Sequence, residues 1–462
     1  MTRYGLTSRQ VSILIFIAAA GILARGVAMD RSYWFDELAT LTHVDVQNFA
    51  ALLRETAQDK QPPLYNGTTF FWVKVFGPGE IAVRSLSLIF GLLTLATPWL
   101  ARTALNHSEK LICFALLSVM SLPIRYAQEA RNYALMLFFA SVCLFAYYEV
   151  LKRPNLWLRV GFYLALSLLA LSHLFGLLLA VSYAAVIFLR PVGRYERLIA
   201  VLFALLMSAA VLVPLVLGGA AESAGGHFWL KFTAQSFAWS LLMLFTPVGL
   251  VLLGYAAFAW RRSPPTIQFD RLLLQAEAPT VLMFLGGVLI SFHTPLINDR
   301  NLIGVIPAFA LLVARLLQRP IARNAVAIPL ALIFLLLVQS ALMMFYGKLF
   351  IREDFRGIAL QSIAANTPAC YAIPDDSDAG WGDIMSFYAL RLFHRPDLAP
   401  RSFARSELSG ARATSGCSLW AEAHPEGRAS DLASLPPFRS CTVIGLRAGF
   451  AASTSVLLTC PK

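Results

Sequence analysis

The chain has 462 residues, of which 58% are hydrophobic and only 14% charged, and its mean hydropathy is +0.65. Soluble domains carry about 25% charged residues, so this composition excludes an ordinary soluble protein and indicates a chain that crosses a lipid bilayer several times. The net charge of +12 does not indicate nucleic-acid binding, because the Lys and Arg residues stand in short loops between apolar segments and form no basic stripe.

Apolar runs of helix length divide most of the chain, and they predict eleven membrane-spanning helices. The first run is interpreted as a retained span, since no small-residue cleavage site follows it. The runs cover residues 11–29, 80–100, 111–124, 134–150, 157–171, 174–189, 198–218, 236–259, 278–293, 302–317 and 324–346.

The loops on the two sides differ in charge. Loops on the side of the N-terminus carry sixteen Lys and Arg, and the opposite loops carry eight in more sequence. The positive-inside rule therefore places the N-terminus in the cytoplasm, and an odd number of spans places the C-terminus in the periplasm. We expect a multi-pass inner-membrane protein whose chemistry faces outward, because most of the acids of functional interest lie in the outer loops. These acids are Asp30, Asp36, Glu37, Glu129, Glu222 and Asp299.

The first outer loop, residues 30–79, opens with SYWFDELAT at 32–40. It places Asp36 and Glu37 directly after three aromatic residues, among them Trp34, which is typical of a membrane interface. An exposed loop acid is the ordinary interpretation of either carboxylate. Because charge is costly at this depth, we favour a functional role, above all for Asp36.

A surface helix is predicted over residues 45–58 of the same loop, with Asp45 as its N-cap and apolar residues at helical spacing. The stretch QPPLY at 61–65 follows, with Gln61 and Tyr65. Tyr65, like Trp34, is either a lining residue of a site or an aromatic anchor at the interface.

Three short outer segments carry the other candidate residues. The segment RYAQEARNY at 125–133 contains Glu129, Arg131 and Tyr133, and helical spacing would place Glu129 and Tyr133 on one face. The turn LSHLFG contains His173, and HTPLINDRN contains Arg300. Each residue also has an ordinary interpretation: the arginines as snorkelling side chains, Glu129 as a partner of Arg131, and His173 as a polar helix end. No spacing of His, Cys and acids predicts a metal site.

Residues 347–462 lack apolar runs and predict a small soluble α/β domain after the transmembrane domain 1–346. The stretch 352–366 has helical spacing, and 370–373, 441–446 and 455–460 are typical of strands. Four cysteines in a periplasmic domain indicate disulfides, with three pairings open. They are Cys370, Cys417, Cys441 and Cys460.

These segments together resemble the GT-C membrane glycosyltransferases, specifically the family 39 and aminoarabinose-transferase-like group, whose donors are sugars on polyprenyl phosphates. The resemblance covers nearly the whole chain in the right order. The matching segments are Asp36-Glu37 among aromatics, QPPLY at 61–65, Gln128–Arg131 with Tyr133, Ser172-His173, Arg300–Leu302 and Glu353–Ala359. One departure is Gln61, where the family often has His before Pro-Pro.

The resemblance implies a polytopic GT-C fold that is surrounded by membrane lipids. It also implies that the protein transfers a sugar at the outer face of the inner membrane. Asp36 would deprotonate an acceptor hydroxyl, and inversion by one displacement is expected. The second catalytic candidate, Glu37, would orient an arginine or bind sugar hydroxyls. Arg131 and Arg300 would hold the leaving phosphate, with Glu129, Tyr133 and His173 beside the donor. Trp34, Gln61 and Tyr65 would line the acceptor side. The acceptor would be an envelope glycolipid such as lipid A or its core, a polysaccharide or a protein. No cofactor is required by this chemistry, and assistance by a divalent cation is left open.

The main alternative from the sequence is a lipid or sugar-lipid transporter. Transporters place ionisable residues near the bilayer midplane on repeated, broken helices, whereas the charged residues here gather at one outer face. A relative that binds a lipid-linked sugar without catalysis is a third alternative, and the sequence does not separate it from the enzyme.

Overall fold

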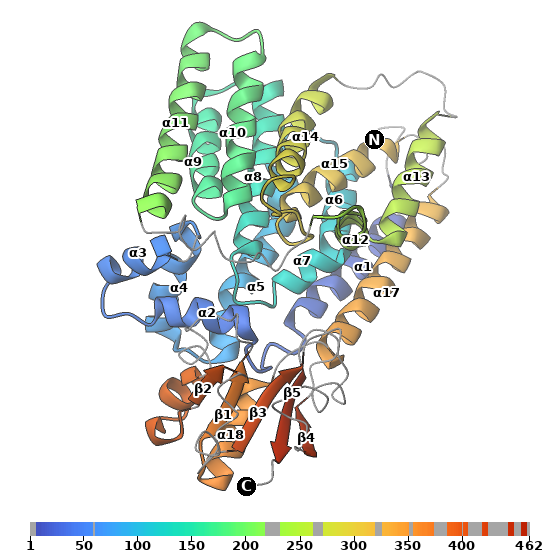
Figure 1. Cartoon of the computed structure of the whole chain (residues 1–462). Coiled ribbons are helices and arrows are strands. Elements are labelled where there is room, and N and C mark those ends of the chain that lie inside the picture. The colour runs from blue at the N-terminus through green and yellow to red at the C-terminus, as the bar shows by residue number, and fades with distance from the viewer. Residues whose placement is uncertain are drawn as a thin grey trace. The chain divides into compact units, whose positions relative to one another are not determined.

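The computed structural model describes residues 6–58, 61–217, 232–261, 271–318, 326–350, 354–373, 386–399, 401–404, 418–423, 442–447 and 454–459. Helices dominate these residues (Figure 1). The chain forms two compact units, of which the first comprises Met1–Val27, Gln47–Thr69 and Arg84–Ala341, and the second comprises Ala28–Val46, Phe70–Val83 and Leu342–Lys462. The second unit therefore joins parts of the first outer loop to the C-terminal region, and the predicted division at residues 346 and 347 stays a prediction.

The helices follow the apolar runs closely. In chain order they are α1 (Ser8–Gly26), α2 (Phe35–Val44), α3 (Phe49–Gln58), α4 (Pro63–Phe76), α5 (Glu80–Ala96), η1 (Thr97–Leu100), α6 (His107–Val119), α7 (Ser121–Tyr126), α8 (Tyr133–Lys152), α9 (Leu156–Ala170), α10 (Leu174–Leu189), α11 (Arg194–Leu217), α12 (Ala234–Phe245), α13 (Pro247–Arg261), α14 (Arg271–Ser291), η3 (Ile303–Val305), α15 (Ile306–Leu316), α17 (Ala327–Phe350) and α18 (Phe355–Ala365).

Six of the described helices are long and apolar enough to cross a membrane, or seven if α12 and α13 count as one span. The apolar helices α9, α10 and η3–α15 are shorter. Backbone polar groups must be satisfied inside lipid, and a helix satisfies them within one segment. The protein is therefore a mostly helical, multi-pass membrane protein, and the number of eleven spans stays a prediction.

The predicted span at 236–259 is not one continuous helix. Helices α12 and α13 meet at an angle of 74°, either as a broken span or as a re-entrant pair. Thr246 lies between them with φ of 61°, and Pro247 begins α13. Proline has no N–H for the preceding helix and disfavours a helical conformation at the residue before it, so the Thr-Pro pair causes the break.

Close packing in the first unit is clearest where α1 crosses α6. A Cβ atom on Gly21 would lie 2.2 Å from the carbonyl oxygen of Ser118, so only glycine permits this approach. Arg25, fully buried in the last turn of α1, donates to the carbonyl oxygens of Gly21, Ser118 and Leu117 at 2.6–2.8 Å. Its charge complements the negative end of the α6 dipole, which explains how an arginine is tolerated inside the first apolar run.

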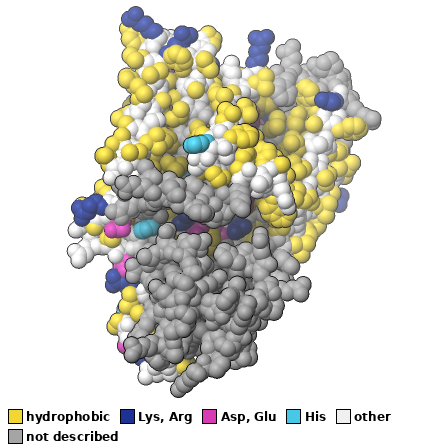
Figure 2. Space-filling model, in the orientation of Figure 1, with side chains coloured by type: hydrophobic (Ala, Val, Ile, Leu, Met, Phe, Trp, Pro, Cys, Tyr) yellow, Lys and Arg dark blue, Asp and Glu magenta, His cyan; other side chains and the backbone are white. Residues whose placement is uncertain are grey.

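The outer surface of this unit is apolar. Helix α10 packs against α9, α11 and α14, and α11 exposes a row of leucines such as Leu202, Leu205 and Leu206. Figure 2 shows hydrophobic side chains spread over these helices and Lys and Arg side chains gathered at one end of them. This is the surface expected of helices that contact lipid.

The second unit contains a five-stranded sheet with the order β2-β1-β3-β5-β4. Its strands are β1 (Ala369–Ile373), β2 (Arg401–Ala404), β3 (Ser418–Ala423), β4 (Thr442–Arg447) and β5 (Thr454–Thr459). β1 is parallel to β2 and β3, while β5 is antiparallel to β3 and β4. The strands predicted near 370, 441 and 455 are thus present, as is the helix predicted at 352–366, described from Phe355 onward.

The structure tests the predicted disulfide bonding at one of the four C-terminal cysteines. Cys370 is disulfide-bonded, whereas Cys113 and Cys143 are free and buried in the membrane helices. Cys417, Cys441 and Cys460 lie outside the described residues, as does the loop acid Glu222. The pairing among the four C-terminal cysteines stays open.

The predicted surface helix begins later than expected. α3 starts at Phe49. The Oδ1 of Asn48 accepts a hydrogen bond from the N–H of Ala51 at 2.9 Å, so Asn48 takes the N-cap position that was expected for Asp45. Asp45 instead ends α2. Both are good N-cap residues, and only the backbone path chooses between them.

Candidate functional site

Three of the predicted segments meet in the first unit. The Nδ2 group of Asn132 donates to Oε1 of Gln61 at 2.8 Å and to the carbonyl oxygen of Ser172 at 3.2 Å. The N–H of Leu64 donates to the carbonyl oxygen of Leu171 at 3.0 Å. The stretch 61–65, the turn before α8 and the turn before α10 are therefore held together by hydrogen bonds.

A second contact fixes the turn that carries Arg131. The hydroxyl of Tyr65 lies 3.1 Å from Oγ of Ser87, which is 3.4 Å from the carbonyl oxygen of Arg131. The N–H of Arg131 also donates to the carbonyl oxygen of Glu129 at 2.8 Å. Because Tyr65 is buried, it supports this turn instead of standing at the surface as an interfacial anchor.

Glu129 has a different geometry from the one predicted. Residues 127–132 form a turn between α7 and α8, so the expected helical face shared by Glu129 and Tyr133 does not exist. The buried Glu129 forms an ion pair at 3.1 Å with Arg125, whose side chain is 47% exposed. The alternative interpretation of Glu129 as a structural partner of Arg131 stays a prediction.

His173 caps helix α10 and is neutral. Its Nδ1 accepts from the N–H of Phe175 at 3.0 Å, so the proton of the neutral ring lies on Nε2. Burial, followed by the positive charges of Arg131 and Arg300, lowers the pKa of His173 to about 3. Its ring lies 5.7 Å from that of Tyr133, which in turn lies 4.7 Å from that of Tyr126.

The positive charges of Arg131 and Arg300, which stand in segments far apart in the sequence, both lower the pKa of the His173 imidazole. Arg131 precedes the first turn of α8. Arg300 precedes η3, which packs against α8 and α10, and α15, which packs against α8. The N-termini of α8 and α10 meet at the Tyr133–His173 contact. Two guanidinium groups, a neutral N–H donor and positive helix ends together favour an anion such as a phosphate group.

The lowered pKa of His173 gives a testable pH dependence. An unfolded chain binds a proton on this residue below about pH 6.5, but the folded chain does so only near pH 3, so its contribution to stability falls as the pH drops through this window. Between pH 7.5 and pH 5 we expect a loss of about 2 kcal/mol from this group.

The control for that measurement is His173→Asn, which keeps an N-cap acceptor but cannot be protonated. Melting temperatures of the purified protein at the two pH values should fall more for the wild type than for this variant. Equal falls in the two proteins would show that His173 titrates normally.

In the second unit, α2 carries Trp34, Asp36 and Glu37 at its start. The buried Glu37 caps its own helix, since its Oε2 accepts from the N–H of Trp34 at 3.3 Å while its N–H donates to the carbonyl oxygen of Trp34. Asp36 lies in the same first turn and is half-buried. The cap explains why an acid stands at 37 and distinguishes the two carboxylates, leaving Asp36 as the better candidate for proton transfer.

Sequence reasoning missed several residues that support these candidates. Asn132 stands between two predicted residues and could have been noticed there, because a buried amide needs partners. Ser87 lies in an apolar run and gives no such signal. In the described ranges, no three His, Cys, Asp or Glu side chains come together in a way that could hold a metal ion.

The chain is similar to several solved structures. ArnT from Cupriavidus metallidurans in the apo state superposes with a TM-score of 0.57 at 14% sequence identity, over 97% of this chain and 98% of that one. The same enzyme bound to undecaprenyl phosphate gives 0.49 at 14% identity, over 96% and 97%. The apo oligosaccharyltransferase of Archaeoglobus fulgidus gives 0.49 at 10% identity, over 90% and 69%.

The similarity to apo ArnT over nearly the full length of both chains shows that this protein has the GT-C fold predicted from its sequence motifs. No family model and no curated protein matches the chain. At this level of identity the likeness concerns the fold alone, so the activity has to be argued from the residues.

Proposed function

We propose that this protein is an inverting glycosyltransferase that moves a sugar from a polyprenyl-phosphate donor to an envelope acceptor. The acceptor oxygen attacks the anomeric carbon, its proton passes to the carboxylate of Asp36, and the bond from that carbon to the phosphate oxygen breaks with its electron pair. Arg131 and Arg300 bind the phosphate as its charge grows, and the Nε2–H of His173 provides a further donor.

The observation that carries this proposal is the packing of apolar helices that begin beside Arg131, His173 and Arg300, with both arginine charges lowering the pKa of the neutral His173. A lipid phosphate needs this combination, since its headgroup lies at the interface while its prenyl chain stays in the bilayer. The order of the sequence motifs and the GT-C fold add independent support. Gln61, Tyr65 and Glu129 keep the arginine-bearing turn in place, and Glu37 and Trp34 form the start of the helix that carries Asp36.

The proposed setting is the inner membrane, with the N-terminus in the cytoplasm and the C-terminal region in the periplasm. The acceptor is an envelope glycolipid such as lipid A or its core, a polysaccharide or a protein. Nothing in this mechanism uses a metal ion, because the arginines supply the positive charge.

Deletion of the gene tests the function as a whole. We expect mass spectrometry of extracted envelope molecules to show one species lighter by a single sugar residue and an accumulated polyprenyl-phosphate sugar. Complementation with the wild-type gene should restore both. The transporter alternative predicts instead that purified protein moves the lipid across vesicles without transferring sugar, and that result would overturn the proposal.

A further inference from the structure

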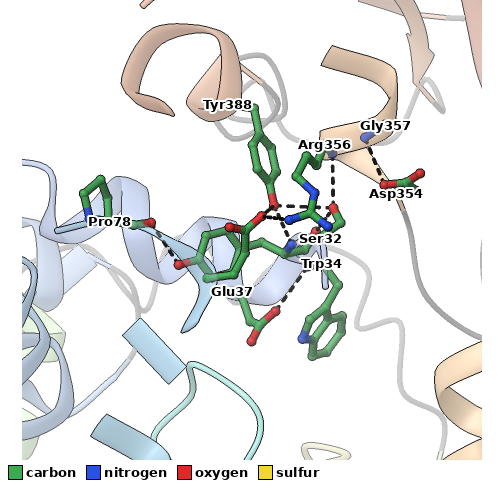
Figure 3. A network of polar contacts seen from close by, with 10 residues as sticks. Ser32, Trp34, Glu37, Pro78, Asp354, Arg356, Gly357 and Tyr388 are labelled. Carbon is green, nitrogen blue, oxygen red and sulfur yellow. Dashed lines mark hydrogen bonds and ion pairs between the residues drawn. The ribbon is translucent and has the colours of Figure 1, made fainter. Parts of the chain in front are cut away.

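A buried tyrosine from the C-terminal region holds the start of helix α2. In the second unit, Oη of Tyr388 accepts a hydrogen bond from the backbone N–H of Tyr33 at 2.6 Å (Figure 3). Tyr33 lies two residues before α2 and three before Asp36. Tyr388 begins η4 (Tyr388–Leu392), a single π-helical turn, a feature found frequently at functional sites.

The same hydroxyl also joins a third segment. Tyr388 donates to Oε1 of Glu80 at 2.9 Å, and Nη1 of Arg356 donates to the same oxygen at 3.1 Å. The backbone N–H of Arg356 donates to Oγ of Ser32 at 3.1 Å. The segments at residues 32–33, at residue 80 and in the C-terminal region at residues 356 and 388 thus form one polar network, shown in Figure 3.

Packing makes the network rigid. Both Tyr33 and Tyr388 are fully buried, their rings lie 6.0 Å apart, and Phe387 meets the Tyr33 ring edge-on at 6.2 Å. The hydroxyl of Tyr33 donates to the carbonyl oxygen of Pro78 at 2.9 Å. Burial, followed by the negative charge of Glu80, raises the pKa of Tyr388, so its hydroxyl keeps the proton that it donates.

The far end of α2 has a second, weaker attachment to the same π-helical turn. Arg391 forms an ion pair with Asp45, the residue that ends α2. Both side chains are substantially exposed, at 54% and 39%. Solvent-exposed ion pairs contribute little, so the buried Tyr388 contact is the one expected to set the position of the helix.

We propose that Tyr388 is a positioning residue for Asp36, acting through its hydrogen bonds to the backbone of Tyr33 and to Glu80. This inference rests on the proposed function, because it assumes that Asp36 removes the acceptor proton. The C-terminal region thereby takes part in catalysis without contacting the reacting atoms.

The proposal follows from how sensitive proton transfer is to geometry. A displacement of about 1 Å in a catalytic group can cost a factor of about 10² in rate. Asp36 lies in the first turn of α2, where helices fray most readily, and the Tyr388 contact fixes Tyr33, two residues before that turn. Loss of the hydroxyl should loosen this turn while the aromatic ring keeps its packing.

The test is Tyr388→Phe in the full-length purified protein, with two measurements. Hydrogen–deuterium exchange should show amides of residues 33–37 exchanging at least tenfold faster than in the wild type. For transfer, the probes are the polyprenyl-phosphate-sugar fraction and the envelope glycolipid fraction extracted from the deletion strain. We expect kcat to fall at least tenfold, with the donor KM changed less than twofold.

Two further variants keep the test decisive. Arg395→Gln removes an exposed contact with Asp397 in the same region and should leave both readouts unchanged. If Tyr388→Phe fails to fold, Ser32→Ala loosens the same segment from the Arg356 side and should have the same two effects.

The proposal is overturned if Tyr388→Phe keeps full kcat, or if kcat falls without faster exchange at 33–37, while Asp36→Asn is inactive. A fully active Asp36→Asn variant would overturn the proposed function instead, so the two failures are distinguishable. Faster exchange together with a fall in kcat and an unchanged KM supports the positioning role.

Discussion

Replacing Asp36 with Asn is expected to reduce sugar transfer by roughly 10² to 10⁴, the contribution typical of a general base. The amide has nearly the shape of the carboxylate but cannot take the proton of the acceptor hydroxyl. Binding of the donor should change little, because the proposed contacts to the phosphate come from Arg131 and Arg300. The loss should therefore appear in kcat and leave the donor KM nearly unchanged.

The measurement uses the donor and acceptor fractions of the deletion strain with purified variants. Asp30→Asn is the matched control, since Asp30 is an exposed acid six residues earlier in the same outer loop and the substitution is identical. That variant should keep wild-type activity. Transfer by Asp36→Asn at the rate of the control would remove Asp36 from the mechanism.

Replacing either Arg131 or Arg300 with Gln is expected to reduce transfer by roughly 10² to 10³, as for the loss of one preorganised donor to a developing charge. The charges of both residues lower the pKa of His173, and under the proposed function both bind one phosphate, so their effects should be less than additive in the double variant. Lys at either position should recover only part of the activity, because an ammonium group cannot bind phosphate oxygens through the paired geometry of a guanidinium.

The readout is kcat together with competition by a polyprenyl phosphate that carries no sugar. The arginine variants should bind this competitor more weakly, whereas Asp36→Asn should bind it as well as the wild type does. Arg54→Gln, at an exposed arginine of α3, serves as the control. Unchanged competitor binding in both arginine variants would contradict the phosphate assignment.

Several features were predictable from the sequence because their causes are local. Each apolar run contains helix, since a chain in lipid must satisfy its backbone groups within the segment. The strands near residues 370, 441 and 455 also follow from short-range pattern. The motif order predicted the fold that the similarity to apo ArnT supports.

Other features depended on partners far away in the chain. The N-cap of the surface helix was expected at Asp45, whereas Asn48 takes that position, and a turn at residues 127–132 replaces the helical face expected for Glu129 and Tyr133. The choice in each case depends on the path of the backbone between helices. Propensity and spacing do not encode that path, because it is set by the packing of whole elements.

The sequence by itself determined where apolar helices form and which polar residues stand at their ends, because hydropathy and charge act along the chain. Only the tertiary structure decided which of those ends meet. It brought Gln61, Asn132 and Ser172 into one set of hydrogen bonds. It also joined Tyr388 to Tyr33, two residues before α2, across 355 positions of sequence. Such contacts arise when buried polar groups must find partners wherever packing places them, and no local pattern records the choice.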